Sequence, residues 1–186
     1  FEPDEFWALC TQHPGVGAFL APTMVQRLRL ALPAGTTPPA GLRSIIYGGG
    51  PMYVQDLKQS LATLGQVFTQ IYGQGESPMT ITWLRREDHA SSDDVLLGSV
   101  GIPRTGVEVR VVDDSGHEVP TGDMGEIIVR GDVVMSGYWR NPHQLQLRIH
   151  HAAGSCWFPT IHAALRRDGY GEVERTRPDR HGHDSE

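Results

Sequence analysis

The residues best suited to ligand chemistry lie in two short glycine-containing segments. Gly48-Gly49-Gly50-Pro51 follows the apolar run from Leu42 to Tyr47, and Tyr72-Gly73-Gln74-Gly75-Glu76 begins at the end of the run from Val67 to Tyr72. Glycine lets a backbone approach a ligand closely, and glutamate is a hard oxygen ligand for cations. Taken singly, these features have ordinary explanations: a tight turn, an aromatic residue at the rim of a core, and a solvated loop carboxylate.

The elements around these segments predict that they lie together. Leu42 to Tyr47 is typical of a strand, and Val67 to Tyr72 of the following strand. Apolar residues at helical spacing stand between them, with Gly65 as the expected C-cap. Strand, helix, strand is a βαβ unit with a right-handed crossover. Because ligands of such sheets bind outside the carboxyl ends of the strands, we expect both segments to line one crevice.

The remaining pattern divides the chain into three parts. Residues 1–84 predict an α/β unit that opens with helix, strand and helix over residues 4–32. Residues 85–142 predict a polar connection and then a small antiparallel β subdomain, because alternating valines around residues 107–112 precede the turn Asp113-Asp114-Ser115-Gly116. Residues 143–186 show no clear period, and 175–186 hold no large apolar side chain, so we expect an irregular or disordered tail.

Composition narrows the class of protein. The 186 residues are 39% hydrophobic and 20% charged, which is typical of a globular chain, and the net charge of -6 gives no electrostatic reason to bind nucleic acid. No apolar run reaches the roughly 18 residues of a membrane span. Cys10 and Cys156 lack metal-ligand spacing and are expected to be reduced thiols in a cytoplasmic protein, and the histidines suggest no metal site. The chain begins without Met, which suggests a fragment.

Four segments, in this order, together resemble the adenylate-forming (AMP-binding) superfamily of acyl-CoA synthetases and related ligases. Each is weak alone, but four in register form a specific signal, and the likeness covers roughly residues 1–142. The segments are Ser44-Ile45-Ile46-Tyr47-Gly48-Gly49-Gly50-Pro51, Ile71-Tyr72-Gly73-Gln74-Gly75-Glu76, Leu97-Gly98-Ser99-Val100-Gly101-Ile102-Pro103, and Gly122-Asp123-Met124-Gly125-Glu126-Ile127-Ile128-Val129-Arg130-Gly131 with Gly137-Tyr138-Trp139.

The resemblance implies a chemistry and roles for residues. A carboxylic acid attacks the α-phosphorus of ATP to give an acyl-adenylate, and the sulfur of coenzyme A then displaces AMP. Tyr72 would stack on the adenine, the backbone of Gly48 to Gly50 would meet its ring edge, and Glu76 would ligate Mg²⁺. The implied nucleotide-binding set is Gly48, Gly49, Gly50, Pro51, Tyr72, Gly73, Gln74, Gly75 and Glu76. Gly50, Gly75, Pro78 and Met79 would border a pocket for a bulky apolar or aromatic carboxylate.

Several family features are missing or altered. The phosphate-binding loop with its lysine has no counterpart, and neither does the C-terminal domain with its catalytic lysine. Gly75 stands where the family has threonine. Thr160-Ile161-His162 stands where a Thr-Gly-Asp motif would hold the ribose, and a neutral imidazole cannot accept two hydrogen bonds as a carboxylate does. Glu174-Arg175-Thr176-Arg177 is only roughly similar to the family's hinge region.

Near the C-terminus, stretches that match the family alternate with stretches that do not. Reading-frame slips in a gene would produce this pattern. The sequence therefore predicts an α/β fragment of an ATP-dependent ligase that joins a fatty or aryl acid to coenzyme A, inactive as this chain. The alternative is a non-catalytic module that binds adenine nucleotides or serves as an interaction surface.

Overall fold

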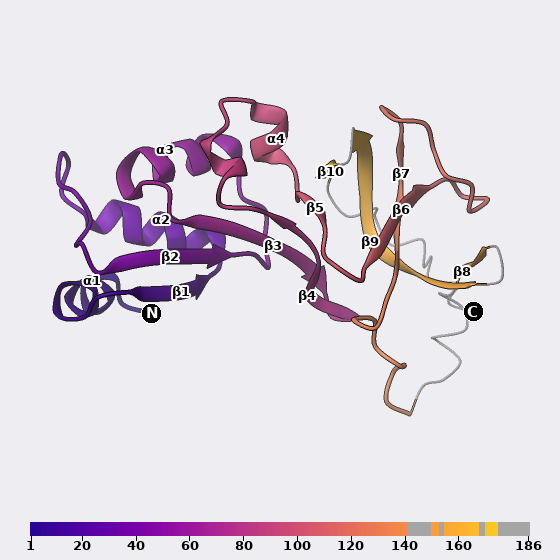
Figure 1. Ribbon diagram of the computed structural model, residues 1–186, viewed down its shortest axis with the longest axis horizontal. Helices are drawn as coiled ribbons and strands as arrows, with labels where there is room; N and C mark the ends of the chain where they lie inside the picture. Colours follow the sequence, from indigo (N-terminus) through magenta and orange to yellow (C-terminus); the bar gives the residue numbers. More distant parts are fainter. Residues whose placement is uncertain (141–149, 153–154, 168–169, 175–186) are drawn as a thin grey trace, which may run out of the picture.

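The computed structural model describes residues 1–140, 150–152, 155–167 and 170–174 of the chain, arranged around two sheets (Figure 1). The first sheet has the order β1-β2-β3-β4-β5, and the second has the order β10-β9-β7-β6. Among the described residues, no helix is both long and apolar enough to cross a bilayer.

The first sheet begins as the predicted α/β unit. Its parallel strands are β1 (Val16–Leu20), β2 (Leu42–Tyr47) and β3 (Phe68–Gln74), and its helices are α1 (Pro3–Gln12), α2 (Pro22–Ala31) and α3 (Val54–Leu64). Figure 1 shows α2 and α3 on the same side of β2 and β3. The core between the helices and the sheet contains Trp7, Leu28, Ile45, Leu57 and Phe68. On the uncovered face, the register partners Phe19 and Ile46 are 56% and 39% exposed.

The sheet continues with two strands that the sequence pattern did not predict. β4 (Ser77–Leu84) pairs antiparallel with β3, and β5 (Ile102–Pro103) pairs antiparallel with β4. The first sheet is therefore mixed rather than purely parallel. The signal for β4 is weak because Gly75-Glu76, which joins it to β3, lacks the Asn-Gly or Asp-Gly sequence of a typical two-residue hairpin.

The predicted polar connection contains two short helical elements, η1 (Asp88–Ala90) and α4 (Asp94–Gly98), and part of it is buried. His89 is only 1% exposed. Its Nδ1–H donates to the carbonyl oxygen of Arg85 at 2.7 Å, which leaves Nε2 to accept from the Tyr47 hydroxyl at 3.0 Å. The ring also stacks on Phe68 with centroids 6.4 Å apart. A polar residue at this site is stable because both of its ring nitrogens are hydrogen-bonded.

The second sheet is the predicted antiparallel β subdomain, with an addition. β6 (Glu108–Val112) and β7 (Met124–Arg130) form its hairpin. The irregular segment expected after Pro142 instead contains β8 (His150–Ala152), β9 (Ser155–Arg167) and β10 (Tyr170–Glu174); β9 pairs with β7, β8 and β10. Pairing with a preformed hairpin supplies order that local sequence does not show. Residues 175–186, expected to be disordered, lie outside the described residues.

Trp157 anchors β9 to that hairpin. Its side chain is 1% exposed, and the guanidinium carbons of Arg110 and Arg130 lie 4.5 and 4.8 Å from its ring centroid. Arg130 also donates from Nε to the Glu108 carboxylate at 3.0 Å. Arg110 and Arg130 each form a cation–π contact with the buried indole ring. Both packing and electrostatic attraction therefore hold Trp157 in place.

We predict that His89 makes folding stability depend on pH. Burial lowers the pKa of His89, so the unfolded chain binds more protons than the folded chain below the ordinary histidine pKa. Stability should fall by up to about 1.4 kcal/mol per pH unit on acidification from about 6.5 down to the lowered pKa, and the His89 contribution should be constant below it. Urea denaturation at a series of pH values measures this slope.

His89→Gln should flatten the slope while lowering overall stability, because it removes the stacked ring. His117→Gln is the matched control, since His117 is 83% exposed and its replacement should leave the slope unchanged. Equal slopes in wild type and His89→Gln would contradict the assignment.

Candidate nucleotide-binding site

The structure brings the two predicted segments to one edge of the first sheet. β2 and β3 are parallel neighbours, with Tyr47 opposite Gln70, so the segments that follow them leave the sheet at the same end. They also touch: a Cβ placed on Gly48 would lie 2.3 Å from the carbonyl oxygen of Ile71. Only glycine allows that approach, which explains the residue type at this position without reference to a ligand.

The second segment is a tight hairpin between β3 and β4. Gln74 pairs with Ser77, so Gly75 and Glu76 form the connection. A Cβ on Gly73 would lie 2.2 Å from the Met79 amide nitrogen, whereas a Cβ on Gly75 would meet nothing within 4 Å. Gly73 is therefore required by packing and Gly75 is not. The backbone therefore has room for a side chain at Gly75, where the adenylate-forming superfamily has threonine.

Met79 connects the two segments. It has a positive φ of 54°, a conformation that non-glycine residues rarely adopt. Its Cε would lie 3.1 Å from a Cβ on Gly49, so its side chain reaches across to the glycine turn. Of the residues predicted to border an acyl pocket, Gly50 lies near Pro22, Pro78 is exposed, and Met79 faces Gly49. The acyl-pocket role of these residues stays a prediction.

Tyr72 lies at the junction of the two sheets. It is 9% exposed and packs in a cluster with Ile81 of β4 and valines of the second sheet. Burial raises the pKa of Tyr72 to about 12, and a hydrogen bond with the Thr160 side chain opposes part of this rise. The hydroxyl is therefore fixed in a dry site and protonated at neutral pH. Stacking of the ring on an adenine stays a prediction.

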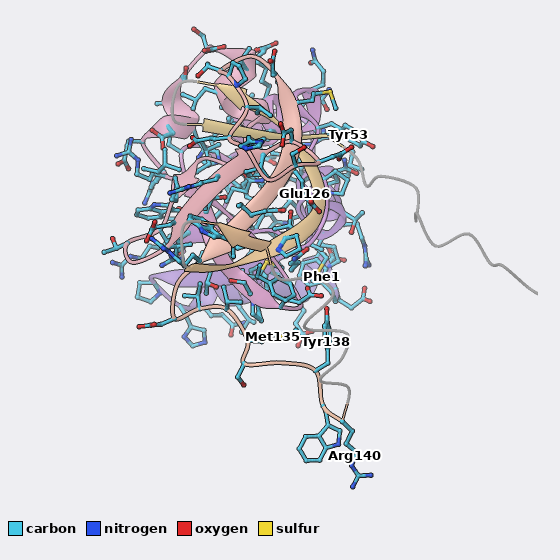
Figure 2. The ribbon with its side chains drawn as sticks, turned by 90° about the vertical axis from the view of Figure 1, so that its right-hand side faces the viewer. Phe1, Tyr53, Glu126, Met135, Tyr138 and Arg140 are labelled. Carbon is cyan, nitrogen blue, oxygen red and sulfur yellow. The ribbon has the colours of Figure 1, made fainter. Side chains whose placement is uncertain are left out.

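Glu76 is held by a loop that comes from the second sheet. Its carboxylate accepts from the Tyr138 hydroxyl at 2.5 Å, and its carbonyl oxygen accepts from the Met135 amide at 2.8 Å. Figure 2 shows Met135 and Tyr138 along the segment that leads to Arg140. The sequence analysis noted Tyr138 only within a Gly-Tyr motif and gave it no role. Spacing cannot reveal this contact, because the partners are 62 residues apart.

The donor chemistry at Glu76 fits Mg²⁺ bound together with a nucleotide. No group of three His, Cys, Asp or Glu residues that could hold a metal occurs in the part of the chain that the structure describes. Mg²⁺ is commonly held by one or two carboxylates plus substrate phosphates, rather than by an all-protein cage. Glu76 would be such a carboxylate, and a neutral phenol beside it adds no positive charge that would repel the ion.

The altered ribose motif lies beside the hairpin. Thr160 of β9 is hydrogen-bonded to Tyr72, and Gln74 Nε2 donates to the carbonyl oxygen of Pro159 at 3.5 Å. Ile161 and His162 follow within the same strand. The motif that should meet the nucleotide's ribose is thus adjacent to the residue expected to meet its adenine, although histidine replaces aspartate. Arg175 of the hinge-like segment lies outside the described residues.

The strand-end glycine turn, the Tyr-Gly hairpin and the carboxylate are segments on which the resemblance to the adenylate-forming superfamily rests. Residues 1–139 match the AMP-binding enzyme family, and the chain belongs to that family. It is 31% identical over 144 residues to the medium/long-chain-fatty-acid–CoA ligase FadD8 of Mycobacterium tuberculosis, covering 77% of this chain and 25% of that protein. It is 32% identical over 142 residues to a feruloyl-CoA synthase of an Amycolatopsis species, covering 76% of this chain and 28% of that protein.

Solved structures agree with this assignment. The amide bond synthetase McbA from Marinactinospora thermotolerans superposes with a TM-score of 0.79 at 31% identity, over 93% of this chain and 34% of that one. ATP-bound MatB from Rhodopseudomonas palustris superposes with a TM-score of 0.78 at 29% identity, over 93% and 33%. The chain therefore spans about a quarter of these curated relatives and a third of these solved chains.

We predict that the two hairpin glycines differ in tolerance to substitution. Gly73→Ala places a methyl group against the backbone of Met79 and Ser77, and should lower the free energy of unfolding by about 2 kcal/mol or more. Gly75→Ala is the matched control, because its methyl group meets nothing, and it should change stability by less than about 0.5 kcal/mol. Urea denaturation compares them, and equal losses would show that the hairpin packing is described wrongly.

Proposed function

We propose that this chain is the portion of an ATP-dependent carboxylate–CoA ligase that contacts the adenine and the Mg²⁺ ion of ATP. We also propose that it does not form an acyl-adenylate by itself. The observation that supports this most directly is the convergence of three segments on one sheet edge. The Gly48–Pro51 turn, the Tyr72–Glu76 hairpin and Pro159-Thr160 of β9 lie there together. Family membership supplies the reaction class, while the activity of the whole protein and its substrates remain part of the proposal.

Each segment has a defined part in this proposal. The backbone of Gly48 to Gly50 meets the edge of the adenine ring, with Pro51 ending the turn, and Tyr72 with Gly73 forms the wall against its face. Gln74 fastens this wall to β9 through Pro159. Glu76 supplies a carboxylate for the Mg²⁺ that accompanies the phosphates; the ion neutralises phosphate charge when bound. Gly75 has no side-chain hydroxyl, so only its backbone N–H would contact a phosphate.

The acyl substrate in this proposal is a bulky apolar or aromatic carboxylic acid, with coenzyme A as acceptor. Two features favour it: the flexible, polarisable side chain of Met79 faces the glycine turn, and the relatives include ligases named for fatty acids and for ferulate. Glycine at position 49 accommodates that side chain, because a Cβ there would lie 3.1 Å from the Met79 Cε.

We predict that the purified 186-residue chain will not catalyse carboxylate-dependent exchange of radiolabelled pyrophosphate into ATP. The physical reason is electrostatic: the transferred nucleotide carries phosphate charge, and the chain brings Glu76 but neither the phosphate-loop lysine nor the ribose aspartate. A complete fatty acid–CoA ligase assayed in parallel serves as the positive control. Exchange above background with fatty or aryl acids would refute the inactivity.

A nucleotide titration separates this proposal from the alternative of a binding module. Trp83 reports on the glycine-turn side of the site, because it pairs with Ile71, which contacts Gly48. We expect no saturable change in tryptophan fluorescence with ATP or AMP in a fragment that lacks half of its contacts. A saturable change that is lost in Trp83→Phe would favour the non-catalytic module instead.

A further inference from the structure

Glu76 stands at a position where its carboxylate would not be ordered by its own strand. It belongs to the two-residue connection between β3 and β4, and its side chain is half-buried. A glutamate side chain has several freely rotating bonds, and fixing such a chain costs about 1 to 2 kcal/mol of conformational entropy. A cation ligand placed here therefore binds better if the fold has already fixed its orientation.

The loop after β7 supplies that restraint at two points. The Met135 amide donates to the Glu76 carbonyl oxygen at 2.8 Å, which fixes the turn, and the Tyr138 hydroxyl donates to Oε1 at 2.5 Å, which fixes the side chain. The loop itself is closed by a bond from the Val134 amide to the Gly131 carbonyl oxygen at 3.1 Å. The carboxylate of the first sheet is thus oriented by a residue that belongs to the second.

The identity of the donor favours this role. A phenol is neutral, so it orients the carboxylate without cancelling its charge, whereas lysine or arginine would compete with the cation for it. An ionised carboxylate has about four acceptor positions, and the Tyr138 hydroxyl occupies one of them. The neighbouring Trp139, 87% exposed, has no such part.

We propose that Tyr138 is a positioning residue that holds the Glu76 carboxylate in the orientation that receives a divalent cation. The inference rests on the proposed cation role of Glu76 and extends it to the Gly137-Tyr138 segment. The order of the loop from residue 131 to 139 then sets how well the cation site is formed. Tyr138 acts through Glu76 and does not itself contact the nucleotide.

The test uses Tb³⁺ as an oxygen-seeking probe of the cation site on the full chain. Its luminescence lifetime is measured under direct excitation, so that loss of an aromatic sensitiser does not affect the signal. The Glu76-dependent component is the part of binding that disappears in Glu76→Gln. Tyr138→Phe removes one oxygen and keeps the ring, and should weaken that component by about 3- to 10-fold. Trp139→Phe, in the same loop, should leave it unchanged.

The double variant Glu76→Gln/Tyr138→Phe separates positioning from a general structural effect. If Tyr138 acts through Glu76, Tyr138→Phe should not weaken Tb³⁺ binding any further in the Glu76→Gln variant. A general loosening of the chain would weaken Tb³⁺ binding both in the wild type and in Glu76→Gln. Glu76→Asp gives a second route that leaves Tyr138 intact. It keeps the charge but withdraws the carboxylate from the phenol, and should weaken binding to a similar extent as Tyr138→Phe.

The outcomes distinguish the two levels of the proposal. If Glu76→Gln removes the Tb³⁺ component but Tyr138→Phe matches wild type, or weakens binding equally in both backgrounds, the positioning role is wrong and the cation role of Glu76 stands. If Glu76→Gln binds Tb³⁺ as wild type does, or wild type shows no saturable component, the cation role fails and the positioning role fails with it.

Discussion

Residues at the end of β3 and in the turn after it carry the contact between the two sheets. Tyr72 is hydrogen-bonded to Thr160, Gln74 to the carbonyl oxygen of Pro159, and Glu76 to Tyr138. Tyr72 and Gln74 of β3 meet β9, and Glu76 of the following turn meets the loop after β7. Beneath it, Tyr72 joins Ile81 and the valines of β6 and β7 in one buried cluster. The candidate site lies where this contact is made, so the same bonds that join the sheets also shape it.

That arrangement was partly predictable from the sequence. The glycine turn after β2 and the Tyr-Gly segment after β3 follow apolar runs, and general rules for parallel sheets place such strand ends together. The hairpin to β4 was missed because Gly75-Glu76 gives little turn signal. The burial of His89 was also missed, since a polar residue in a charged stretch becomes a core residue only through distant partners such as Tyr47. The Glu76–Tyr138 contact joins residues 62 positions apart, a relation that no local pattern contains.

The residues of the candidate site differ in how far the fold alone explains them. Gly48 and Gly73 are explained by backbone packing alone, so their presence does not by itself indicate a nucleotide. Gly75, by contrast, is free of packing constraints, and the loss of a hydroxyl there reflects no demand of the fold. Glu76 and Tyr138 form a hydrogen bond between the two sheets, and the carboxylate in this pair has the chemistry of a cation ligand. Family membership gives the reaction class. Residues that backbone packing already explains, such as Gly48 and Gly73, add no further evidence for that reaction.

The uncovered face of β1 and β2 has a practical consequence. Phe19 and Ile46 stand side by side in register, both exposed, and β1 is the last strand at its end of the sheet order. An apolar surface next to a strand edge that pairs with no other described strand is the combination from which sheets of separate molecules join edge to edge. Preparations of this chain should therefore be expected to self-associate as the concentration rises, and a charged residue at position 19 is the simplest change by which to improve its solubility.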